Sequence, residues 1–288
     1  MLRDVAPAKI NLFLHVLGRR SDGYHHLESL VTFADLSDEL ALEPDHPLGL
    51  DVEGPFGFGL GGDDNLVLKA ARAFVAQFGR VRLGRFRLKK NLPVASGIGG
   101  GSSDAAAALR LLARLNAIDV SDAGLLDAAR TLGADVPVCL DPSAPRLMHG
   151  IGHELGNRLH AFRYPAMLVN PGIPLETRAV FDRLGLKPGD RHAPASTPVD
   201  ASFDGAFAML ESTRNDLEAP ARALAGEIET VITLLQAQEG CRFARMSGSG
   251  ATCFAIFDSI QAAHAAQAAC RIVEPGWWSQ SCLMKLPA

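Results

Sequence analysis

Alternating apolar and polar side chains predict a strand near the start of the chain. Between residues 10 and 17 every second side chain is aliphatic, beginning with Ile10, and Asn11 lies between the first two of them. A period of two places successive side chains on opposite faces of a strand. Lys9 and Asn11 therefore share the face opposite to the aliphatic one.

Helical and strand patterns then follow one another irregularly. Apolar spacing of three or four predicts helices at 65–78, 105–115, 122–132, 177–184, 203–211, 219–238 and 261–271. Further strands are predicted at 30–33, 39–42, 48–53, 85–90, 146–149, 167–170, 242–246, 252–257 and 281–285. Residues 134–137 are expected to form a loop, because Pro137 disfavours a continuing helix. Since strict βαβ alternation is absent, the predicted fold class is α+β.

A domain boundary is expected near residue 158. It would divide the chain into domains 1–158 and 159–288, and the second could form a split βαβ, ferredoxin-like layer. Residues 188–198 combine Gly, Pro and Ser and are predicted to form a loop.

Composition narrows the function classes. The chain has 288 residues, is 48% hydrophobic and carries a net charge of −4, which gives no overall electrostatic reason to bind nucleic acid or an anionic membrane. The five cysteines form no Cys-x-x-Cys pair, so neither a disulfide framework nor a thiolate zinc site is indicated. No apolar run approaches the ~18 residues of a membrane span, and the start lacks a signal peptide pattern. From these features we expect a cytoplasmic protein. A small-molecule substrate and a monomeric or weakly dimeric state are further expectations that composition by itself does not give.

The first of three glycine clusters has dinucleotide-binding spacing in an unsuitable context. Gly57, Gly59 and Gly62 match G-x-G-x-x-G, but Pro55 interrupts the strand that would precede the loop. Asp63 and Asp64 would repel a phosphate, and no acidic residue for a ribose occurs between 65 and 103. This cluster is predicted to be a surface loop.

The second cluster, at 97–103, comes directly before an alanine-rich helix. Helix N-termini offer free N–H groups and a partial positive charge, and glycines let several amides converge on one anion. A glycine-rich turn before a helix would explain one or two of these glycines but poorly all four. The surrounding segment 65–103 also holds eight basic residues, of which Lys90 is closest to the loop entrance. We therefore predict a phosphate-binding loop.

The third cluster, Ser247 to Gly250, separates two predicted strands. It is either a hairpin turn or a second group of amides that contacts a ligand. The sequence leaves both interpretations open.

Three ordered motifs resemble those of the GHMP kinase superfamily. Residues 93–105, PVASGIGGGSSDA, are similar to its central phosphate-binding motif, and APAKINLFL at 6–14 and MSGSGATC at 246–253 are similar to the other two. Residues 19–28 and 133–138 resemble the members that act on a cytidine diphosphate-linked polyol. The resemblance covers nearly the whole chain.

This resemblance implies an activity and a fold. The activity is ATP-dependent and Mg²⁺-dependent phosphorylation of the 2-hydroxyl of 4-(cytidine 5′-diphospho)-2-C-methyl-D-erythritol, in non-mevalonate isoprenoid precursor biosynthesis. The fold is a ribosomal-S5-like N-terminal domain and a ferredoxin-like C-terminal domain, with the active site in the cleft between them. A phosphoryl transfer to an alcohol requires a base, cations and a phosphate site.

The resemblance also assigns roles to residues of this sequence. Asp135 is the catalytic base, and Lys9 is its cationic partner. The ATP-binding residues are Pro93, Val94, Ala95, Ser96, Gly97, Ile98, Gly99, Gly100, Gly101, Ser102, Ser103 and Asn65, and Lys90 is added because of its place at the loop entrance. The substrate-binding residues are Asn11, Tyr24, His25, Thr177 and Phe181. Taken singly, Asp135 could be an ordinary loop carboxylate and Tyr24 and His25 ordinary surface side chains.

One segment departs from the family pattern. Many relatives have an arginine-glycine pair where this chain has His149, His153 and Glu154 among glycines. The spacing is not H-E-x-x-H, so we expect no metal site there. Any role of the missing arginine is open.

Other functions remain as alternatives. Another kinase of the superfamily would act on homoserine, mevalonate or a sugar. A nicotinamide-binding oxidoreductase would use residues 57–62, but the acidic ribose ligand is missing. A nucleotide-binding regulator without turnover would not need Lys9 and Asp135.

Overall fold

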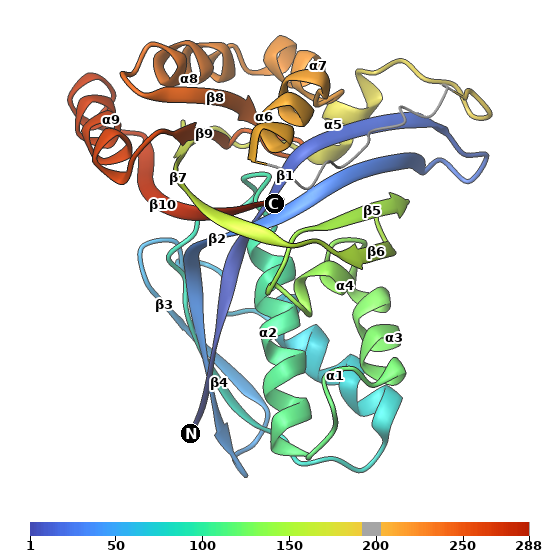
Figure 1. Ribbon diagram of the computed structural model, residues 1–288. Coiled ribbons are helices and arrows are strands. Elements are labelled where there is room, and N and C mark those ends of the chain that lie inside the picture. The colour runs from blue at the N-terminus through green and yellow to red at the C-terminus, as the bar shows by residue number, and fades with distance from the viewer. Residues whose placement is uncertain (192–202, 288) are drawn as a thin grey trace. The chain divides into compact units, whose positions relative to one another are not determined.

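The computed structural model describes residues 1–191 and 203–287, which form two compact units (Figure 1). Unit 1 contains Met1–Lys9, Leu36–Val94 and Gly99–Pro142. Unit 2 contains the described parts of Ile10–Asp35, Ala95–Ile98 and Ser143–Ala288. Most of the loop predicted at 188–198 lies outside the described residues.

Two long strands contribute residues to both units. β1 is Leu2–Arg19 and β2 is His25–Pro44, and the two strands pair with each other. Side chains on both faces of β1 are buried from Ala6 to Val16, so the predicted alternation continues but neither face meets solvent there. The separate strands predicted at 30–33 and 39–42 are parts of β2.

Unit 1 joins a small sheet and four helices. β4 (Gly84–Lys89) pairs in parallel with β3 (Gly49–Glu53) and antiparallel with the end of β2. The helices are α1 (Leu66–Phe78), α2 (Gly100–Leu115), α3 (Ala123–Leu132) and the short α4 (Val136–Cys139). α1, α2 and α3 pack side by side (Figure 1). α2 is buried along most of its length, because its many alanines let neighbouring helices approach closely.

Unit 2 is built on an antiparallel sheet. Its strands follow the order β2-β10-β7-β9-β8, where β7 is Ala161–Asn170, β8 is Cys241–Met246, β9 is Cys253–Phe257 and β10 is Trp278–Pro287. β10 and β7 pair over their whole lengths. A hairpin of β5 (Arg146–Gly150) and β6 (Glu154–Arg158) pairs with the start of β2.

Five helices complete the described part of unit 2. They are α5 (Thr177–Asp182), α6 (Phe203–Ser212), α7 (Glu218–Leu224), α8 (Glu227–Gln236) and α9 (Ile260–Val273). α8 packs against β8 and β9, and α9 packs against β7, β9 and β10. The core of this unit includes Val169, Ile228, Val231 and Phe257.

Most predicted elements are confirmed, and three differ for local reasons, besides the two strands merged in β2. The helix predicted at 105–115 begins earlier, at Gly100, so part of the glycine loop is helical. The helix predicted at 219–238 is interrupted where Ala225 is extended, next to Gly226, a weak helix former. Pro137 does not prevent a helix but lies in the first turn of α4, where proline is tolerated. β6 was not predicted.

The described elements form a mixed α and β fold, as expected, while the boundary near residue 158 stays a prediction. No described helix is both long and apolar enough to cross a membrane.

Candidate functional site

Lys9 and Asp135 meet within unit 1. Lys9 lies on β1, and its ammonium donates a hydrogen bond of 2.7 Å to Oδ2 of Asp135, the residue that precedes α4. The Lys9 side chain is only 5% exposed, whereas that of Asp135 is 38% exposed. The Asp135 carboxylate makes no capping hydrogen bond to α4. A buried cation therefore holds a carboxylate that stays partly exposed.

The N-terminus of α2 has the properties of an anion site. Gly99 is its N-cap, in the left-handed conformation with φ of 62°, and provides no side-chain cap. The first N–H groups of a helix have no partner within the helix. They carry partial positive charge, which favours a phosphate group. This agrees with the predicted phosphate-binding loop.

Close packing explains several of the loop glycines. A Cβ on Gly99 would lie 3.1 Å from the Lys9 side chain, and one on Gly100 would lie 3.0 Å from Nζ of Lys90. In unit 2, a Cβ on Gly97 would lie 2.6 Å from the carbonyl oxygen of Ser247. Lack of space thus adds a structural reason for the glycines that the sequence interpretation did not include.

The turn from Ser247 to Gly250 connects β8 and β9 and also holds part of the glycine loop. The Ser247 hydroxyl donates to the Gly97 carbonyl at 3.1 Å, and the Thr252 N–H donates to the Ser96 carbonyl at 3.1 Å. The hairpin interpretation is confirmed. The contacts with residues 96 and 97 show a second role, because the turn supports the backbone of the predicted phosphate-binding loop.

The remaining loop residues differ in exposure. Val94 and Ala95 are exposed, Ser102 is partly exposed, and Pro93 and Ile98 are buried. Ser103 faces inward, where its hydroxyl donates to the Pro7 carbonyl at 2.7 Å.

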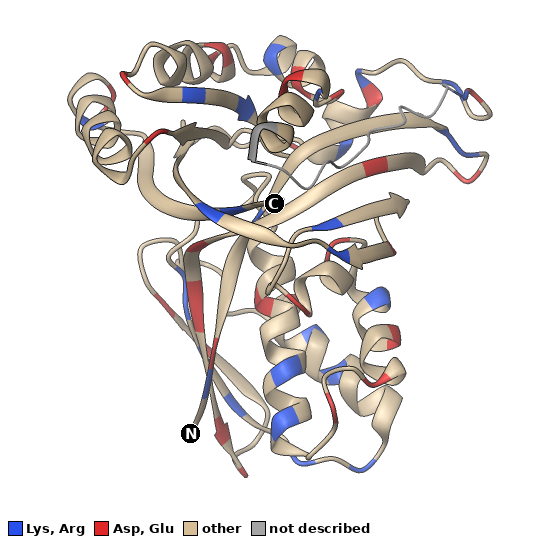
Figure 2. Ribbon diagram, viewed as in Figure 1, with Lys and Arg blue, Asp and Glu red and all other residues tan. Residues whose placement is uncertain are grey.

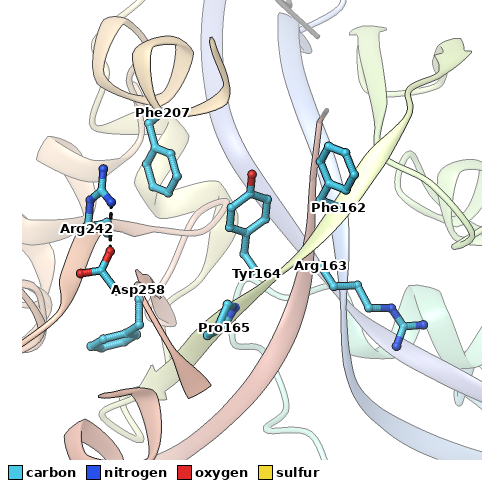
Figure 3. Close-up of a pocket in the computed structure, with 8 residues that line it drawn as sticks. Phe162, Arg163, Tyr164, Pro165, Phe207, Arg242 and Asp258 are labelled. Atoms are coloured by element: carbon cyan, nitrogen blue, oxygen red, sulfur yellow. Dashed lines mark hydrogen bonds and ion pairs between the residues drawn. The ribbon is translucent and has the colours of Figure 1, made fainter. Parts of the chain in front are cut away.

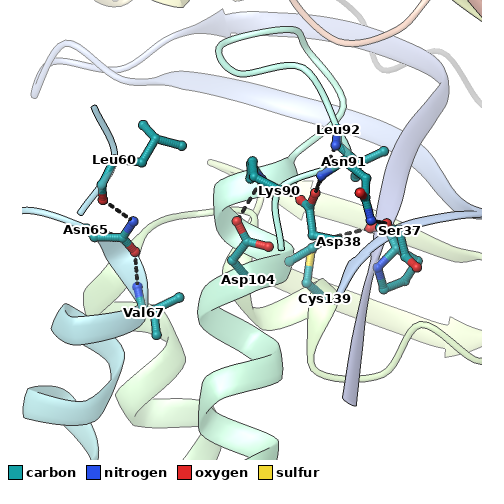
Figure 4. Close-up of polar contacts among 12 residues, drawn as sticks. Ser37, Asp38, Leu60, Asn65, Val67, Lys90, Asn91, Leu92, Asp104 and Cys139 are labelled. Atoms are coloured by element: carbon teal, nitrogen blue, oxygen red, sulfur yellow. Dashed lines mark hydrogen bonds and ion pairs between the residues drawn. The ribbon is translucent and has the colours of Figure 1, made fainter. Parts of the chain in front are cut away.

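Lys90 has a different place from the one that the sequence suggested. Its ammonium is buried and forms ion pairs with Asp38 and, at 2.7 Å, with Asp104 (Figure 4). Burial would lower the pKa of Lys90, but the two carboxylates outweigh burial and raise it. The expectation that Lys90 reaches a ligand phosphate is therefore corrected, since its charge is already enclosed by two acids.

The other basic residues of 65–103 are mostly paired with acidic ones. Figure 2 shows the basic and acidic positions along the ribbon. Six of them form ion pairs: Lys69 with Asp64, Arg72 with Asp63, Arg82 with Asp45, Arg85 with Asp51, Arg87 with Glu43 and Lys89 with Glu39. Sequence counting missed this because the acids precede the segment. These pairs form a solvated, locally neutral surface.

Asn65 caps α1. Its Oδ1 accepts the Val67 N–H at 2.9 Å, and its Nδ2 donates to the Leu60 carbonyl at 2.8 Å (Figure 4). The preceding cluster at 57–62 is a surface loop, as predicted: Gly59, Gly61 and Gly62 face open space, and Phe58 is fully exposed.

Asn11 lies in a buried polar group of unit 2. Its Nδ2 donates to the Ser29 hydroxyl at 2.7 Å, and its backbone N–H donates to the Ser247 hydroxyl at 3.1 Å. Its Oδ1 is buried and has no hydrogen-bond partner among the described residues. Ser29 was not found from the sequence, because nothing local distinguishes it from other strand serines.

His25 and Phe181 come together from distant parts of unit 2. Their rings stack with centroids 4.7 Å apart. Burial, with the positive charge of Arg19, lowers the pKa of His25. Its Nε2 is buried without a partner among the described residues.

Two further predicted substrate residues lie near the surface of unit 2. Tyr24 is 61% exposed and follows a turn in which Asp22 accepts its N–H at 3.2 Å. The hydroxyls of Thr177 and Ser249 are 2.9 Å apart, so the Ser247 to Gly250 turn also contacts the start of α5. Ser249 was not among the predicted site residues, although its motif was singled out.

No metal cluster emerges in the parts of the chain that the structure describes, because no three His, Cys, Asp or Glu side chains gather suitably. This includes His149, His153 and Glu154, which lie on or beside the β5–β6 hairpin. A separate cavity of about 530 Å³ in unit 2 has Phe162, Tyr164 and the ion pair of Arg242 with Asp258 in its wall (Figure 3). None of the predicted site residues lines it.

Comparisons with known proteins match both halves of the chain. Residues 65–141 match the GHMP kinases N terminal domain, and residues 206–274 match the GHMP kinases C terminal model. A 4-diphosphocytidyl-2-C-methyl-D-erythritol kinase from Methylorubrum extorquens is 57% identical over 283 residues, covering 96% of this chain and 97% of the relative.

Solved structures of kinases also resemble this chain over nearly its whole length. A crystal structure of 4-(cytidine 5′-diphospho)-2C-methyl-D-erythritol kinase is 34% identical, with a TM-score of 0.79 and coverage of 98% of this chain and 99% of that one. A mevalonate kinase from L. major, in complex with R-mevalonate, has a TM-score of 0.70 at 18% identity, with coverage of 100% and 97%. At 18% identity this second likeness shows the fold alone.

Proposed function

The chain belongs to the GHMP kinase family, and from this premise we propose that it transfers the γ-phosphoryl group of ATP to the 2-hydroxyl of 4-(cytidine 5′-diphospho)-2-C-methyl-D-erythritol. This reaction would supply a phosphorylated intermediate for isoprenoid precursor biosynthesis. The relatives that act on this substrate match nearly the whole chain at high identity. These relatives favour the cytidine-linked alcohol as the acceptor over homoserine, mevalonate or a sugar.

The observation that carries the proposal is the pairing of Lys9 with Asp135. Asp135 takes the proton of the acceptor hydroxyl while the hydroxyl oxygen attacks the γ-phosphorus of ATP. The P–O bond to ADP breaks, and ADP leaves. The Lys9 ammonium, 2.7 Å from the carboxylate, holds Asp135 in place and stabilises negative charge that develops on the attacking oxygen.

The phosphates of ATP bind at the glycine loop in this proposal. The free amides at the start of α2 donate to the phosphate oxygens, and Ser102 adds a partly exposed hydroxyl. Residues 93–101 form the wall of this site, with Asn65 near the nucleotide base. The structure gives Ser103 and Lys90 internal partners, so we assign them to support of the loop.

Magnesium fits this arrangement as a companion of ATP. Asp135 is the one acidic residue among the predicted site residues, which suits an ion that takes most of its ligands from substrate phosphates and water. When bound, Mg²⁺ neutralises charge on the transferring phosphoryl group.

The cytidine end of the acceptor binds through residues of unit 2. Tyr24 stacks on the cytosine, and a neutral His25 hydrogen-bonds to its edge. Asn11 offers the methylerythritol hydroxyls a buried carbonyl oxygen that has no partner among the described residues. Thr177 and Phe181 line the same site. The proposal also includes an S5-like and a ferredoxin-like domain, with the active site in the cleft between them. It further includes a cytoplasmic location and a monomeric or weakly dimeric state.

The test measures ADP formation with ATP, Mg²⁺ and a panel of alcohols. We expect turnover with 4-(cytidine 5′-diphospho)-2-C-methyl-D-erythritol and none with homoserine, mevalonate or galactose. Asp135→Asn should lower kcat by about 10²-fold or more, because a positioned base contributes at least that much. Asp127→Asn is the control, since Asp127 is an exposed carboxylate paired with Arg130 on α3. Turnover of Asp135→Asn within a few-fold of the unmodified protein would remove the base assignment.

A further inference from the structure

Three buried charged side chains connect the two ends of the glycine loop within unit 1. Asp38 lies on β2, Lys90 directly follows β4, and Asp104 lies on α2. Their side chains are at most 4% exposed. Figure 4 shows the carboxylate of Asp104 directed toward Lys90.

Asp38 fixes the entrance of the loop. Its Oδ1 accepts the N–H groups of Asn91 and Leu92, at 2.6 and 2.8 Å, and its Oδ2 accepts the Lys90 ammonium. One carboxylate thus holds three consecutive residues. Because charged acceptors form stronger hydrogen bonds than neutral ones, Asp38 restrains this part of the backbone.

Lys90 carries the connection to the exit of the loop. Its ammonium donates to Oδ2 of Asp104 at 2.7 Å, and a Cβ on Gly100 would lie only 3.0 Å from Nζ. The ammonium therefore packs against Gly100, the first residue of α2, and also pairs with Asp104, one turn further along the helix. A displacement of Lys90 would move the amides that begin the helix.

Within this cluster the charge of the Lys90 ammonium is already paired, so it does not need a ligand phosphate. Two carboxylates already surround one ammonium, and the three side chains are almost fully buried. A buried network with few free groups favours one arrangement, since breaking it leaves an unpaired charge away from water. The cluster is therefore suited to orientation rather than to ligand contact.

We propose that Lys90, Asp38 and Asp104 are positioning residues that set the loop entrance and the first turn of α2 in register, so that the free amides of α2 converge on the phosphates of a nucleotide. This inference rests on the proposed function, because it assumes that a nucleotide binds at the glycine loop. The bridge from Lys90 to Asp104 is its central feature.

Two substitutions at Asp104 distinguish the loss of the hydrogen bond between Lys90 and Asp104 from the loss of the negative charge of Asp104. Asp104→Asn and Asp104→Ala both remove the negative charge, and both leave Lys90 paired with Asp38. Only Asn keeps an oxygen that accepts from the Lys90 ammonium. Asp104→Ala should raise the Kd for ADP and the KM for ATP about tenfold, the size expected for a lost hydrogen bond to a charged group. Asp104→Asn should stay within about threefold, and the KM for the alcohol should not change in either variant.

A double variant separates positioning from stability. Lys90→Met alone leaves two buried carboxylates facing each other, which should lower Tm. Adding Asp104→Asn removes that repulsion and should recover Tm, while the KM for ATP stays raised because the bridge is still absent. Lys89→Met is the matched control, since the neighbouring Lys89 forms only an exposed ion pair with Glu39, at 3.0 Å.

The outcomes are distinct. The positioning role is overturned if Asp104→Ala and Asp104→Asn bind nucleotide with equal affinity. It is also overturned if the double variant recovers the KM for ATP together with Tm. If the unmodified protein neither binds ADP nor uses ATP, the proposed function fails, and the inference fails with it.

Discussion

The imidazole of His25 stacks on the ring of Phe181, with an angle of 27° between the two planes. His25 begins β2 and Phe181 lies on α5, so two elements far apart in the sequence share one aromatic contact. The contact fixes the plane of the imidazole. Burial, with the positive charge of Arg19, lowers the pKa of His25, which favours the neutral ring with one nitrogen able to accept a hydrogen bond.

Phe181→Ala should weaken binding of the cytidine-linked alcohol. An aromatic pair contributes about 0.5 to 1.5 kcal/mol, so the KM for the alcohol should rise about 2- to 10-fold while the KM for ATP stays the same. Phe58→Ala provides the control, because Phe58 is fully exposed. Steady-state kinetics with each substrate varied in turn measure both constants. A parallel rise of the two KM values would speak against a local role in alcohol binding.

Lys9→Met should lower kcat about 10²-fold, the typical effect of removing one group that stabilises transition-state charge. The aliphatic part of Met keeps the packing of the buried Lys9 side chain. The control is Lys69→Met, which removes an exposed lysine paired with Asp64 at 3.1 Å. Circular dichroism should show that both variants are folded. A kcat for Lys9→Met equal to that of Lys69→Met would contradict the catalytic assignment.

Gly97→Ala should destabilise the protein more than Gly59→Ala does. Both glycines have positive φ, 75° and 78°, so alanine costs about 1 to 2 kcal/mol at either position. Only at Gly97 would the new Cβ also meet backbone, 2.6 Å from the Ser247 carbonyl oxygen, whereas Gly59 faces open space. Urea denaturation gives the free energies of unfolding. Equal values for the two variants would show that the contact between the loop and the turn is not tight.

Asp104 should make stability fall as pH rises. Burial, with the nearby charge of Asp38, raises the pKa of Asp104 from 3.8 to about 7, although Lys90 opposes the shift. The folded protein then binds a proton that the unfolded chain releases, so ν_N exceeds ν_U between about pH 4 and 7 and the free energy of unfolding decreases across this range. Its contribution is complete below about pH 4 and lost above about pH 7. Asp104→Asn should lack this component when both proteins are unfolded in urea at several pH values from about 4 to 8. Parallel curves would contradict the raised pKa.

Local features of the candidate site could be predicted from the sequence. The glycine loop before a helix, the strand that carries Lys9 and Asn11, and the surface loop at 57–62 all follow from side-chain period, glycine and proline placement and flanking charge. The motif resemblance added Asp135, whose own neighbours gave little sign of a special role. Each of these inferences depends on residues that are close along the chain.

The place of Lys90 shows where such reasoning ends. Its neighbour Lys89 is also a lysine, and strand alternation alone does not tell which of the two faces a buried carboxylate. Asp38 is distant in sequence, so the ion pair becomes visible only when β2 and β4 pair antiparallel, with Glu39 opposite Lys89. The same pairing neutralises Arg87 and Lys89, which the sequence presented as part of an unpaired basic segment.

The sequence by itself determined the mixed α and β composition, most of the elements and the identity of the loop that begins α2, because these depend on local backbone preference and side-chain period. Tertiary structure alone decided which charges meet. It buried Lys90 between two acidic side chains and left Asp135 partly exposed beside a buried Lys9. It also placed the Ser247 turn against Gly97. Burial and pairing depend on contacts between distant segments, and only the folded chain brings those segments within hydrogen-bond distance.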